Sequence, residues 1–547
     1  MTNKPHNGHS VARTLNLRTA ILLIGVMGAS ALIWNIATDN PPSTDGDRFE
    51  QIDAYVRDEM NDSRIPGVSI AIVEVGQTVH TVGFGNDGHG IDITPATPFW
   101  IGSNTKSMTA LATMQLVEAG LVELDTPVQH YLPEFRVADA TASTQITVRH
   151  LLNQTSGLAR VDGLRAVAEA KDQTLDEAVA DMRDLKLNRP IGASFEYANL
   201  NSVVLGRLVE QVAGQTWQQY VQTNIFDPLG MSRTFTSHEL AEQNGLTDTH
   251  RFVYGYPIET DGTHLEGLAP SGYIYSTAED MARYLTMYNQ GGVLDGNRVL
   301  SASGIAEMLA PATNERTFQL QGQRFAARYG AGWFVGRFGA ADDARWHQGS
   351  LPHFTGWMVL LPDSDQAVVV LINAGNQFEI GGANGAWSRI PQGIVNLLRG
   401  TDPPAGISTA RFFVIFDTLV VIAVVSQAWT FARVASRRRT LTQSTLVKIT
   451  PLAWELIVAP LVLLGYPSIT GGLGWAAAFG FVPDLSLTVL TVAGLAVLTG
   501  LIRALRLLHS RMTRTTEIDV TATPDSARTI QPDPVAADSG RPFTAVR

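Results

Sequence analysis

The chain has 547 residues, a length that suggests roughly two to four domains. Charged residues make up 17% of it and the formal net charge is −11, which argues against a disordered protein and against a general affinity for nucleic acid. The chain contains no cysteine, so disulfides, Cys-based zinc sites, iron–sulfur clusters and a cysteine nucleophile are excluded.

The first predicted element is an apolar segment over residues 19–37 that contains no charged residue. As a helix it would reach about 28 Å, close to the roughly 30 Å of a bilayer core. It is either a transmembrane anchor behind a cytoplasmic N-terminus of residues 1–18, or a signal segment cleaved near Ala29-Ser30-Ala31. The apolar residues that follow this cleavage site favour the anchor, and both alternatives export the next domain.

Residues 40–405 form the predicted extracytoplasmic domain. Short apolar runs bounded by turn residues predict strands near both of its ends, over residues 67–75, 78–85, 345–349, 356–361 and 367–373. Helical periodicity predicts helices over residues 48–60, 103–119, 174–185, 202–212 and 386–398. This arrangement predicts an α+β fold, in which an antiparallel β-sheet is flanked by helices and carries an all-helical insertion.

Three further apolar segments predict transmembrane helices over residues 412–431, 449–466 and 485–502. Clustered positive residues lie between the first two segments and after the last, whereas the connection over residues 467–484 has none. The positive-inside rule therefore predicts a multi-pass protein of the cell membrane, with cytoplasmic termini and with residues 40–405 as a periplasmic or extracellular domain. The polar, aperiodic residues 513–547 predict a disordered cytoplasmic tail.

Cofactor and metal motifs find no support in this sequence. Residues 83–88 match G-x-G-x-x-G, but no helix is predicted after them, so a hairpin turn explains the glycines better than dinucleotide binding. The twelve histidines show no metal-ligand spacing, and the chain has no phosphate-loop motif. We therefore expect no cofactor, no metal and no nucleic-acid partner.

Ser103 and Lys106 form an S-x-x-K motif at the start of the helix predicted over residues 103–119. Residues i and i+3 share a helix face, so the hydroxyl and the amine can meet. Burial disfavours the ammonium form, which allows a lysine to act as the base for a serine nucleophile. Chance often produces this short motif, but Lys106 is the only lysine between residues 5 and 170 and lies on an otherwise apolar helix.

Two further motifs occur in a fixed order with S-x-x-K. They are Tyr197-Ala198-Asn199, a Y-x-N motif, and His347-Gln348-Gly349, an H/K-x-G motif. Together the three motifs resemble those of the serine β-lactamase-like hydrolases, the superfamily of class C β-lactamases, DD-carboxypeptidases and esterases. The resemblance extends from about residue 48 to residue 398 and implies a β-lactamase/transpeptidase-like fold.

The resemblance also implies a role for each motif residue. Ser103 would attack a carbonyl group and form an acyl-enzyme, with Lys106 and Tyr197 as a coupled base in which the lysine cation lowers the pKa of the phenol. Asn199 would orient Lys106 and the substrate amide. Substrate binding and the oxyanion hole would involve His347, Gly349 and Ser350, with the backbone N–H groups of Ser103 and Ser350 as the oxyanion donors.

His347 narrows the expected substrate. At this position dedicated class C β-lactamases have lysine. A histidine here makes the chain resemble the DD-peptidases, D-amino-acid peptidases and esterases of the superfamily. We therefore expect a membrane-anchored peptidase that acts next to D-amino acids on a small peptide or peptidoglycan-like substrate. An esterase with the same machinery is the first alternative. A sensor that a β-lactam acylates once is the second, although no cytoplasmic effector domain is recognisable.

Overall fold

The computed structural model describes residues 47–320, 323–375, 385–406, 409–436, 451–469 and 474–521. The apolar segment of residues 19–37 and the predicted N-terminus of residues 1–18 lie outside them. Contacts divide the chain into two units. The larger comprises Met1–Val425 and Leu463–Val492, and the smaller comprises Ser426–Val462 and Ala493–Arg547.

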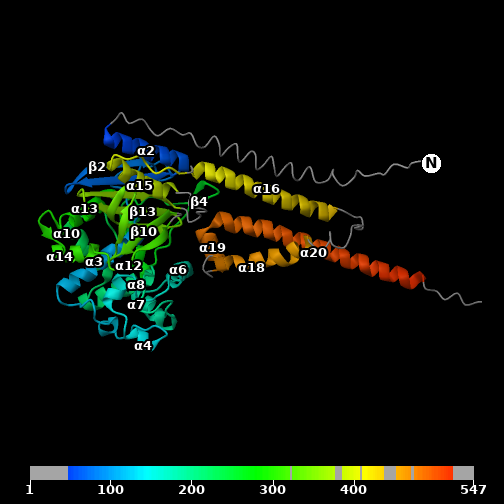
Figure 1. Ribbon diagram of the computed structural model, residues 1–547, viewed down its shortest axis with the longest axis horizontal. Coiled ribbons are helices and arrows are strands. Elements are labelled where there is room, and N and C mark those ends of the chain that lie inside the picture. Colours follow the sequence, from blue (N-terminus) through cyan, green and yellow to red (C-terminus); the bar gives the residue numbers. More distant parts are fainter. Residues whose placement is uncertain are drawn as a thin grey trace, which may run out of the picture. The chain divides into compact units, whose positions relative to one another are not determined.

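The larger unit contains an eight-stranded antiparallel sheet in the order β2-β1-β14-β13-β12-β11-β10-β9 (Figure 1). Its strands are β1 (Gly67–Glu74), β2 (Gln77–Gly85), β9 (Arg316–Leu320), β10 (Gln323–Tyr329), β11 (Phe334–Phe338), β12 (Ala341–Leu351), β13 (Phe354–Leu361) and β14 (Gln366–Ile372). Strand β1 pairs with β14, so residues from the two ends of the domain lie side by side. The predicted α+β fold with an antiparallel sheet is confirmed.

Helices cover both faces of this sheet, which explains why its central strands read as continuous apolar runs. Helices α2 (Arg48–Ser63) and α15 (Ala386–Leu398) pack against each other over one face, and α13 (Ala278–Asn289) packs on the other face against β1 and β14. Strands β13 and β14 are buried along their whole length. One apolar cluster fills the space on each side of the sheet.

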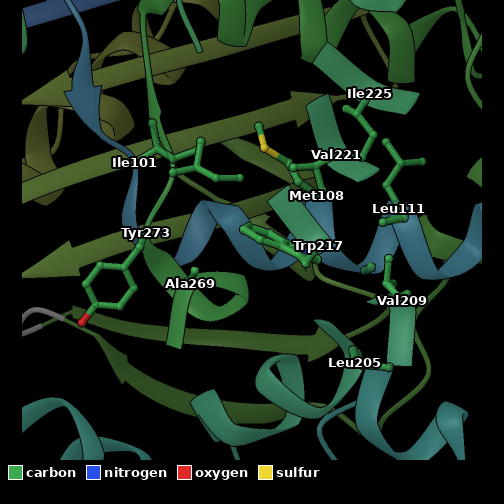
Figure 2. Packing of buried hydrophobic residues seen from close by; sticks show 14 of the residues in the cluster. Ile101, Met108, Leu111, Leu205, Val209, Trp217, Val221, Ile225, Ala269 and Tyr273 are labelled. Atoms are coloured by element: carbon green, nitrogen blue, oxygen red, sulfur yellow. The ribbon is translucent and has the colours of Figure 1, made fainter. Parts of the chain in front are cut away.

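The predicted helical insertion lies between β3 (Phe99–Trp100) and β6 (Tyr275–Ser276). Its helices are α3 (Thr105–Glu118), α4 (Ala140–Ser143), α5 (Val148–Leu152), α6 (Arg160–Glu169), α7 (Leu175–Ala180), α8 (Asn199–Ala213), α9 (Trp217–Val221), α10 (Asp227–Leu229), α11 (His238–Gln243) and α12 (Ala269–Gly272). Helix α3 is buried on nearly all sides and packs against α8, with Met108 and Leu111 facing the same apolar cluster as Trp217 (Figure 2). This packing fixes the position of the first turn of α3.

The remaining elements of the larger unit are short. They are β4 (His250–Val253), β5 (Tyr256–Glu259), β7 (Val293–Leu294), β8 (Asn297–Arg298), α14 (Ala302–Leu309) and β15 (Ala374–Gly375). Strands β4 and β5 form an antiparallel hairpin, and β4 pairs in parallel with β15, directly after the central strand β14. The hairpin is therefore attached to the end of a central strand of the large sheet.

Three described helices are long and apolar enough to cross a membrane: Thr409–Ser436, Pro451–Ser468 and Pro483–His509. They contain α16 (Thr409–Ser436), most of α18 (Ala459–Ile469) and the first part of α20 (Pro483–Thr521), and they overlap the three predicted C-terminal spans. A shorter helix, α19 (Gly474–Phe481), lies between the last two. Because α20 continues to Thr521, the start of the predicted disordered tail is helical, and residues 522–547 lie outside the described part.

Two of these membrane-length helices are joined by an ion pair within the smaller unit. Glu455 Oε1 lies 2.8 Å from an Arg503 nitrogen, and Glu455 is only 4% exposed. Glu455 belongs to a π-helical turn, Trp454–Val458, and a Cβ on Gly500 would lie 2.7 Å from the Glu455 Cβ. The absence of a side chain at Gly500 thus allows the two helices to approach each other beside the pair.

Candidate active site

Ser103 lies in a 3₁₀ turn, Gly102–Asn104, that connects β3 to the buried helix α3. In a 3₁₀ turn, residues i and i+3 lie above one another. Lys106 Nζ accordingly lies 2.9 Å from Ser103 Oγ, so the structure brings together the two side chains of the S-x-x-K motif. The close contact allows direct proton transfer between the hydroxyl and the amine.

Strand β12 lies against this turn because two glycines allow a close approach. Gly102 has φ of +55°, a left-handed conformation that favours glycine. A Cβ on Gly349 would overlap the carbonyl oxygen of Ile101 and would lie 3.0 Å from the Gly102 Cα. The backbone at Gly349 and Ser350 is therefore held beside the nucleophile turn, the place predicted for the second oxyanion donor.

Lys106 is 2% exposed, and its amine also donates a hydrogen bond to the carbonyl oxygen of Ser271 at 2.5 Å. Burial, and after it the positive charge of Arg160, hold the pKa of Lys106 well below its ordinary value. A lysine in this state is a free amine over much more of the pH range than a solvent-exposed one. The side chain is therefore suited to accept the proton of Ser103.

Tyr197 joins the pair from the segment directly before α8. Its ring centroid lies 5.0 Å from Lys106 Nζ. Burial raises the pKa of the Tyr197 phenol well above its ordinary value, although a hydrogen bond with Ser103 and the charge of Arg160 act in the opposite direction. The expected lowering of this pKa by a lysine cation is therefore not found, since burial dominates at both groups and favours a neutral phenol beside a neutral amine.

His347 is 1% exposed, and neighbouring groups occupy both of its ring nitrogens. Nδ1 lies 2.9 Å from the carbonyl oxygen of Gln348, and Nε2 lies 3.3 Å from the Tyr329 hydroxyl. This pattern fits an imidazole that donates from Nδ1 and accepts at Nε2. Burial, with a smaller effect of Lys106, lowers the pKa of His347 to about 3, so it carries no charge at neutral pH. His347, which is predicted to bind substrate, is thus a neutral group whose ring centroid lies 6.0 Å from that of Tyr197.

Asn199, the first residue of α8, makes no side-chain hydrogen bond with the described residues. The structure therefore brings together Ser103, Lys106 and Tyr197, but it gives no contact through which Asn199 would orient Lys106. The carbonyl oxygen of Ser271 has that position instead. Sequence reasoning missed this contact because any residue supplies a carbonyl oxygen.

Arg160 is a second group near the site that the motifs do not identify. It begins α6, and its backbone N–H donates to Glu196 Oε1 at 3.0 Å, directly before Tyr197 in the chain. Helix α6 also lies close to Asn199, because a Cβ on Gly163 would be 3.1 Å from the Asn199 Cβ. Arg160 is thereby placed where its charge acts on both Lys106 and Tyr197.

Metal-ligating side chains do not gather around Ser103. Within the described residues, the one group of three or more such side chains with suitable spacing is His89, Asp248 and Glu259, none of which contacts the motif residues. Around Ser103 the structure instead places the buried amine of Lys106 and the ring of Tyr197.

Comparisons with known proteins find a matching family and similar sequences. Residues 52–387 match the family described as Beta-lactamase. The chain is 25% identical over 489 residues to Protein flp of Staphylococcus aureus (strain MW2), covering 86% of this chain and 93% of that protein. It is 30% identical over 323 residues to Penicillin-binding protein 4 of Amycolatopsis lactamdurans, covering 57% of this chain and 81% of that protein.

Two solved structures resemble the chain in fold. The octameric penicillin-binding protein homologue from Pyrococcus abyssi aligns with a TM-score of 0.57 at 26% identity, covering 66% of this chain and 80% of that one. The D-amino acid amidase from Ochrobactrum anthropi SV3, solved in complex with L-phenylalanine amide, aligns with a TM-score of 0.54 at 22% identity. This second alignment covers 64% of this chain and 99% of the amidase.

Proposed function

The chain belongs to the Beta-lactamase family, and on that basis we propose that it is a membrane-anchored serine peptidase that cleaves an amide bond next to a D-amino acid outside the cytoplasm. The observation that carries the proposal is the 2.9 Å contact of Ser103 Oγ with the buried amine of Lys106. The likeness to a penicillin-binding protein and to a D-amino acid amidase supports the choice of substrate. The three membrane-length helices support the anchoring.

In the proposed reaction, neutral Lys106 takes the hydroxyl proton of Ser103 as Oγ attacks the carbonyl carbon of the substrate. The carbonyl oxygen becomes an oxyanion, which accepts hydrogen bonds from the backbone N–H groups of Ser103 and Ser350. When the C–N bond breaks, the leaving nitrogen receives a proton from Lys106 through the Tyr197 hydroxyl. A water molecule then cleaves the acyl-enzyme ester, giving one proton back to Ser103 and releasing the acid.

The role of Lys106 as a base predicts a pH profile that depends on Arg160. Activity requires the free amine, so kcat/KM is high above the lowered pKa of Lys106 and falls as the pH decreases through it. Arg160→Gln removes one cause of the lowering, so the pKa of Lys106 should rise and the acid limb of the profile should move to higher pH. Steady-state kinetics across the acid and neutral range would measure this movement.

Arg165→Gln is the matched control, because Arg165 lies on the same helix and pairs with Asp162 at 2.8 Å. Its acid limb should coincide with that of the wild-type protein. An Arg160→Gln profile that does not move, or an equal movement in both variants, would contradict the assignment of Lys106 as the titrating base.

The close approach at Gly349 predicts a second kinetic effect. Gly349→Ala introduces a Cβ that overlaps the Ile101 carbonyl oxygen, so β12 must move away from the nucleophile turn and take the Ser350 N–H with it. Loss of one oxyanion donor lowers kcat by about 10²–10³-fold in enzymes of this kind. We expect a decrease of this size, measured as kcat on a saturating substrate.

Gly356→Ala is the control for this substitution. Gly356 pairs with Gly349 across β12 and β13, but the nearest atom to a Cβ at this position is a side-chain nitrogen of Asn104 at 3.1 Å. Its kcat should therefore fall far less. Equal losses in the two variants would show that general distortion of the sheet, and not the loss of an oxyanion donor, explains the effect.

Turnover by the full-length protein in detergent tests the proposed substrate class. The panel consists of D-Ala-D-Ala peptides, N-acyl-D-amino-acid peptides, p-nitrophenyl esters and a chromogenic cephalosporin. We expect the D-peptides to be cleaved with the highest kcat/KM and the cephalosporin slowly, because His347 stands where dedicated lactamases have lysine. Cleavage of the esters alone would favour the esterase, and a single stable acylation by the cephalosporin without peptide turnover would favour the sensor.

A further inference from the structure

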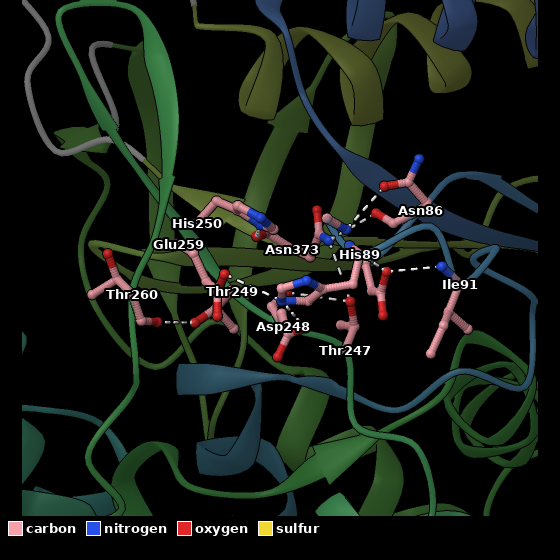
Figure 3. A network of polar contacts seen from close by, with 12 residues as sticks. Asn86, His89, Ile91, Thr247, Asp248, Thr249, His250, Glu259, Thr260 and Asn373 are labelled. Carbon is pink, nitrogen blue, oxygen red and sulfur yellow. Dashed lines mark hydrogen bonds and ion pairs between the residues drawn. The ribbon is translucent and has the colours of Figure 1, made fainter.

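Three metal-ligating side chains meet on the surface of the larger unit, away from the motif residues. His89 follows β2, Asp248 precedes β4, and Glu259 ends β5 (Figure 3). His89 Nε2 lies 3.4 Å from Asp248 Oδ2 and 3.2 Å from Glu259 Oε2. His89 is far in the sequence from Asp248 and Glu259, which lie at the two ends of one hairpin, so no spacing motif could have identified this cluster.

The spacing of the three ligand atoms fits a small divalent cation. All three lie within 4.8 Å of one another. A tetrahedral zinc ion binds histidine nitrogen and carboxylate oxygen at about 2.0–2.2 Å, which places neighbouring ligand atoms about 3.3 Å apart. The two measured separations from His89 Nε2 are close to this value, so an ion could enter with only small movements of the side chains.

The charges of the cluster also favour a cation. In the described part of the chain, neither carboxylate group pairs with a lysine or an arginine, and their one ion-pair partner is His89. Two carboxylates that repel each other across one imidazole would be stabilised by a bound divalent ion.

The loop that carries His89 is held in place by hydrogen bonds. Asp87 Oδ1 accepts from the backbone N–H groups of His89 at 2.8 Å and Ile91 at 3.0 Å. On the other side of the cluster, Thr249 Oγ1 donates to the carbonyl oxygen of Thr260 at 2.6 Å and closes the end of the hairpin. The ligands are thus presented by ordered backbone, which lowers the entropy cost of binding an ion.

A buried histidine beneath the loop is an independent sign of a ligand site. His250 is 6% exposed, and its Nδ1 lies 3.2 Å from the carbonyl oxygen of Asn373. Its Nε2 makes no hydrogen bond with the described residues, and it would lie 2.6 Å from a Cβ on Gly88, the residue before His89. The Nε2 of His250 therefore faces the loop that carries His89 (Figure 3).

We propose that His89, Asp248 and Glu259 bind a divalent transition-metal ion, with zinc as the best match and water completing its coordination. Imidazole together with carboxylates suits zinc, whereas calcium prefers six to eight oxygen ligands. The ion would connect the loop after β2 to the β4–β5 hairpin, which pairs with β15 at the end of the central strand β14. Its role is to fix the hairpin to the sheet.

The test is zinc binding by the full-length protein in detergent, with any affinity tag removed and metal stripped by a chelator. Titration calorimetry with Zn²⁺ should give one site, and Zn²⁺ should raise the Tm of the protein. A variant with His89→Ala, Asp248→Asn and Glu259→Gln should bind at least about 100-fold more weakly and lose the increase in Tm. Replacement of Zn²⁺ by Co²⁺ should give a visible spectrum in the wild-type protein only.

His130→Ala is the matched control, because His130 is exposed and lies outside the cluster. It should keep the affinity and the increase in Tm. The exposed positions of His89 and Glu259 make loss of folding a poor explanation for weakened binding, and circular dichroism of the triple variant checks it directly. No Zn²⁺ binding by the wild-type protein, or equal binding by the triple variant, would overturn the proposal.

Discussion

Ser103→Ala should abolish turnover of every substrate of this protein, with a decrease in kcat/KM of at least about 10⁴-fold. In the proposed reaction the substitution removes the atom that forms the acyl-enzyme, while the amine of Lys106 and the backbone donors stay in place. The same variant should lose covalent labelling by a fluorophosphonate probe, which requires only an activated serine. Steady-state kinetics and in-gel fluorescence measure the two effects.

Ser107→Ala serves as the control for this experiment. Ser107 lies in the first turn of α3, four residues after Ser103, and its hydroxyl donates to the carbonyl oxygen of Asn104 at 2.8 Å. The Ser107→Ala variant should still be labelled at Ser103, because the Ser107 hydroxyl does not contact Lys106. Unchanged labelling of Ser103→Ala would place the nucleophile elsewhere and would remove the basis of the proposed reaction.

Lys106→Ala and Tyr197→Phe should each lower kcat/KM by about 10²–10⁴-fold, the usual contribution of a group that transfers a proton. Lys106 Nζ lies beside both Ser103 Oγ and the Tyr197 ring, so in the proposed reaction the two residues transfer the same proton. Their losses should therefore not multiply in the double variant. A double-mutant cycle on kcat/KM measures this coupling.

Circular dichroism is the control for folding in these variants, because Lys106 is buried and the alanine leaves a cavity. Near-wild-type turnover by either folded single variant would refute its part in proton transfer. Losses that multiply in the double variant would mean that Lys106 and Tyr197 act in separate steps.

The central part of the fold could be predicted from the sequence because it depends on local patterns. Residues 367–373 form an apolar run, and β14 is a strand buried on both faces. The insertion was predicted from helical periodicity. Both ends of α3 and the C-terminal end of α8 lie within two residues of the prediction, and α8 begins three residues earlier than predicted. Strands β9 to β11 were not predicted, because they lie towards one edge of the sheet and each contains arginine in place of an apolar run.

In the candidate active site too, local sequence predicts some features, and others depend on the packing of distant segments. The contact between Ser103 and Lys106 is set by a separation of three residues on one turn, so the motif predicts it. The protonation states of Lys106 and Tyr197 depend on burial by distant elements, which no local pattern reports. The contact of Lys106 with the Ser271 carbonyl and the surface cluster at His89 likewise arise only when separate segments of the chain pack together.

For the proposed membrane protein, the pair formed by Glu455 and Arg503 bears on how the C-terminal helices enter a bilayer. A lone charged residue in the middle of an apolar helix opposes its transfer from the translocon into lipid by about 2.5–3.5 kcal/mol. Partnered at 2.8 Å, the carboxylate and the guanidinium offset each other's charge, so the helix of Pro451–Ser468 is better suited to enter as a hairpin with Pro483–His509 than alone. The helix of Pro451–Ser468 would then enter the lipid only after the helix of Pro483–His509 has been made, and the two helices would insert together.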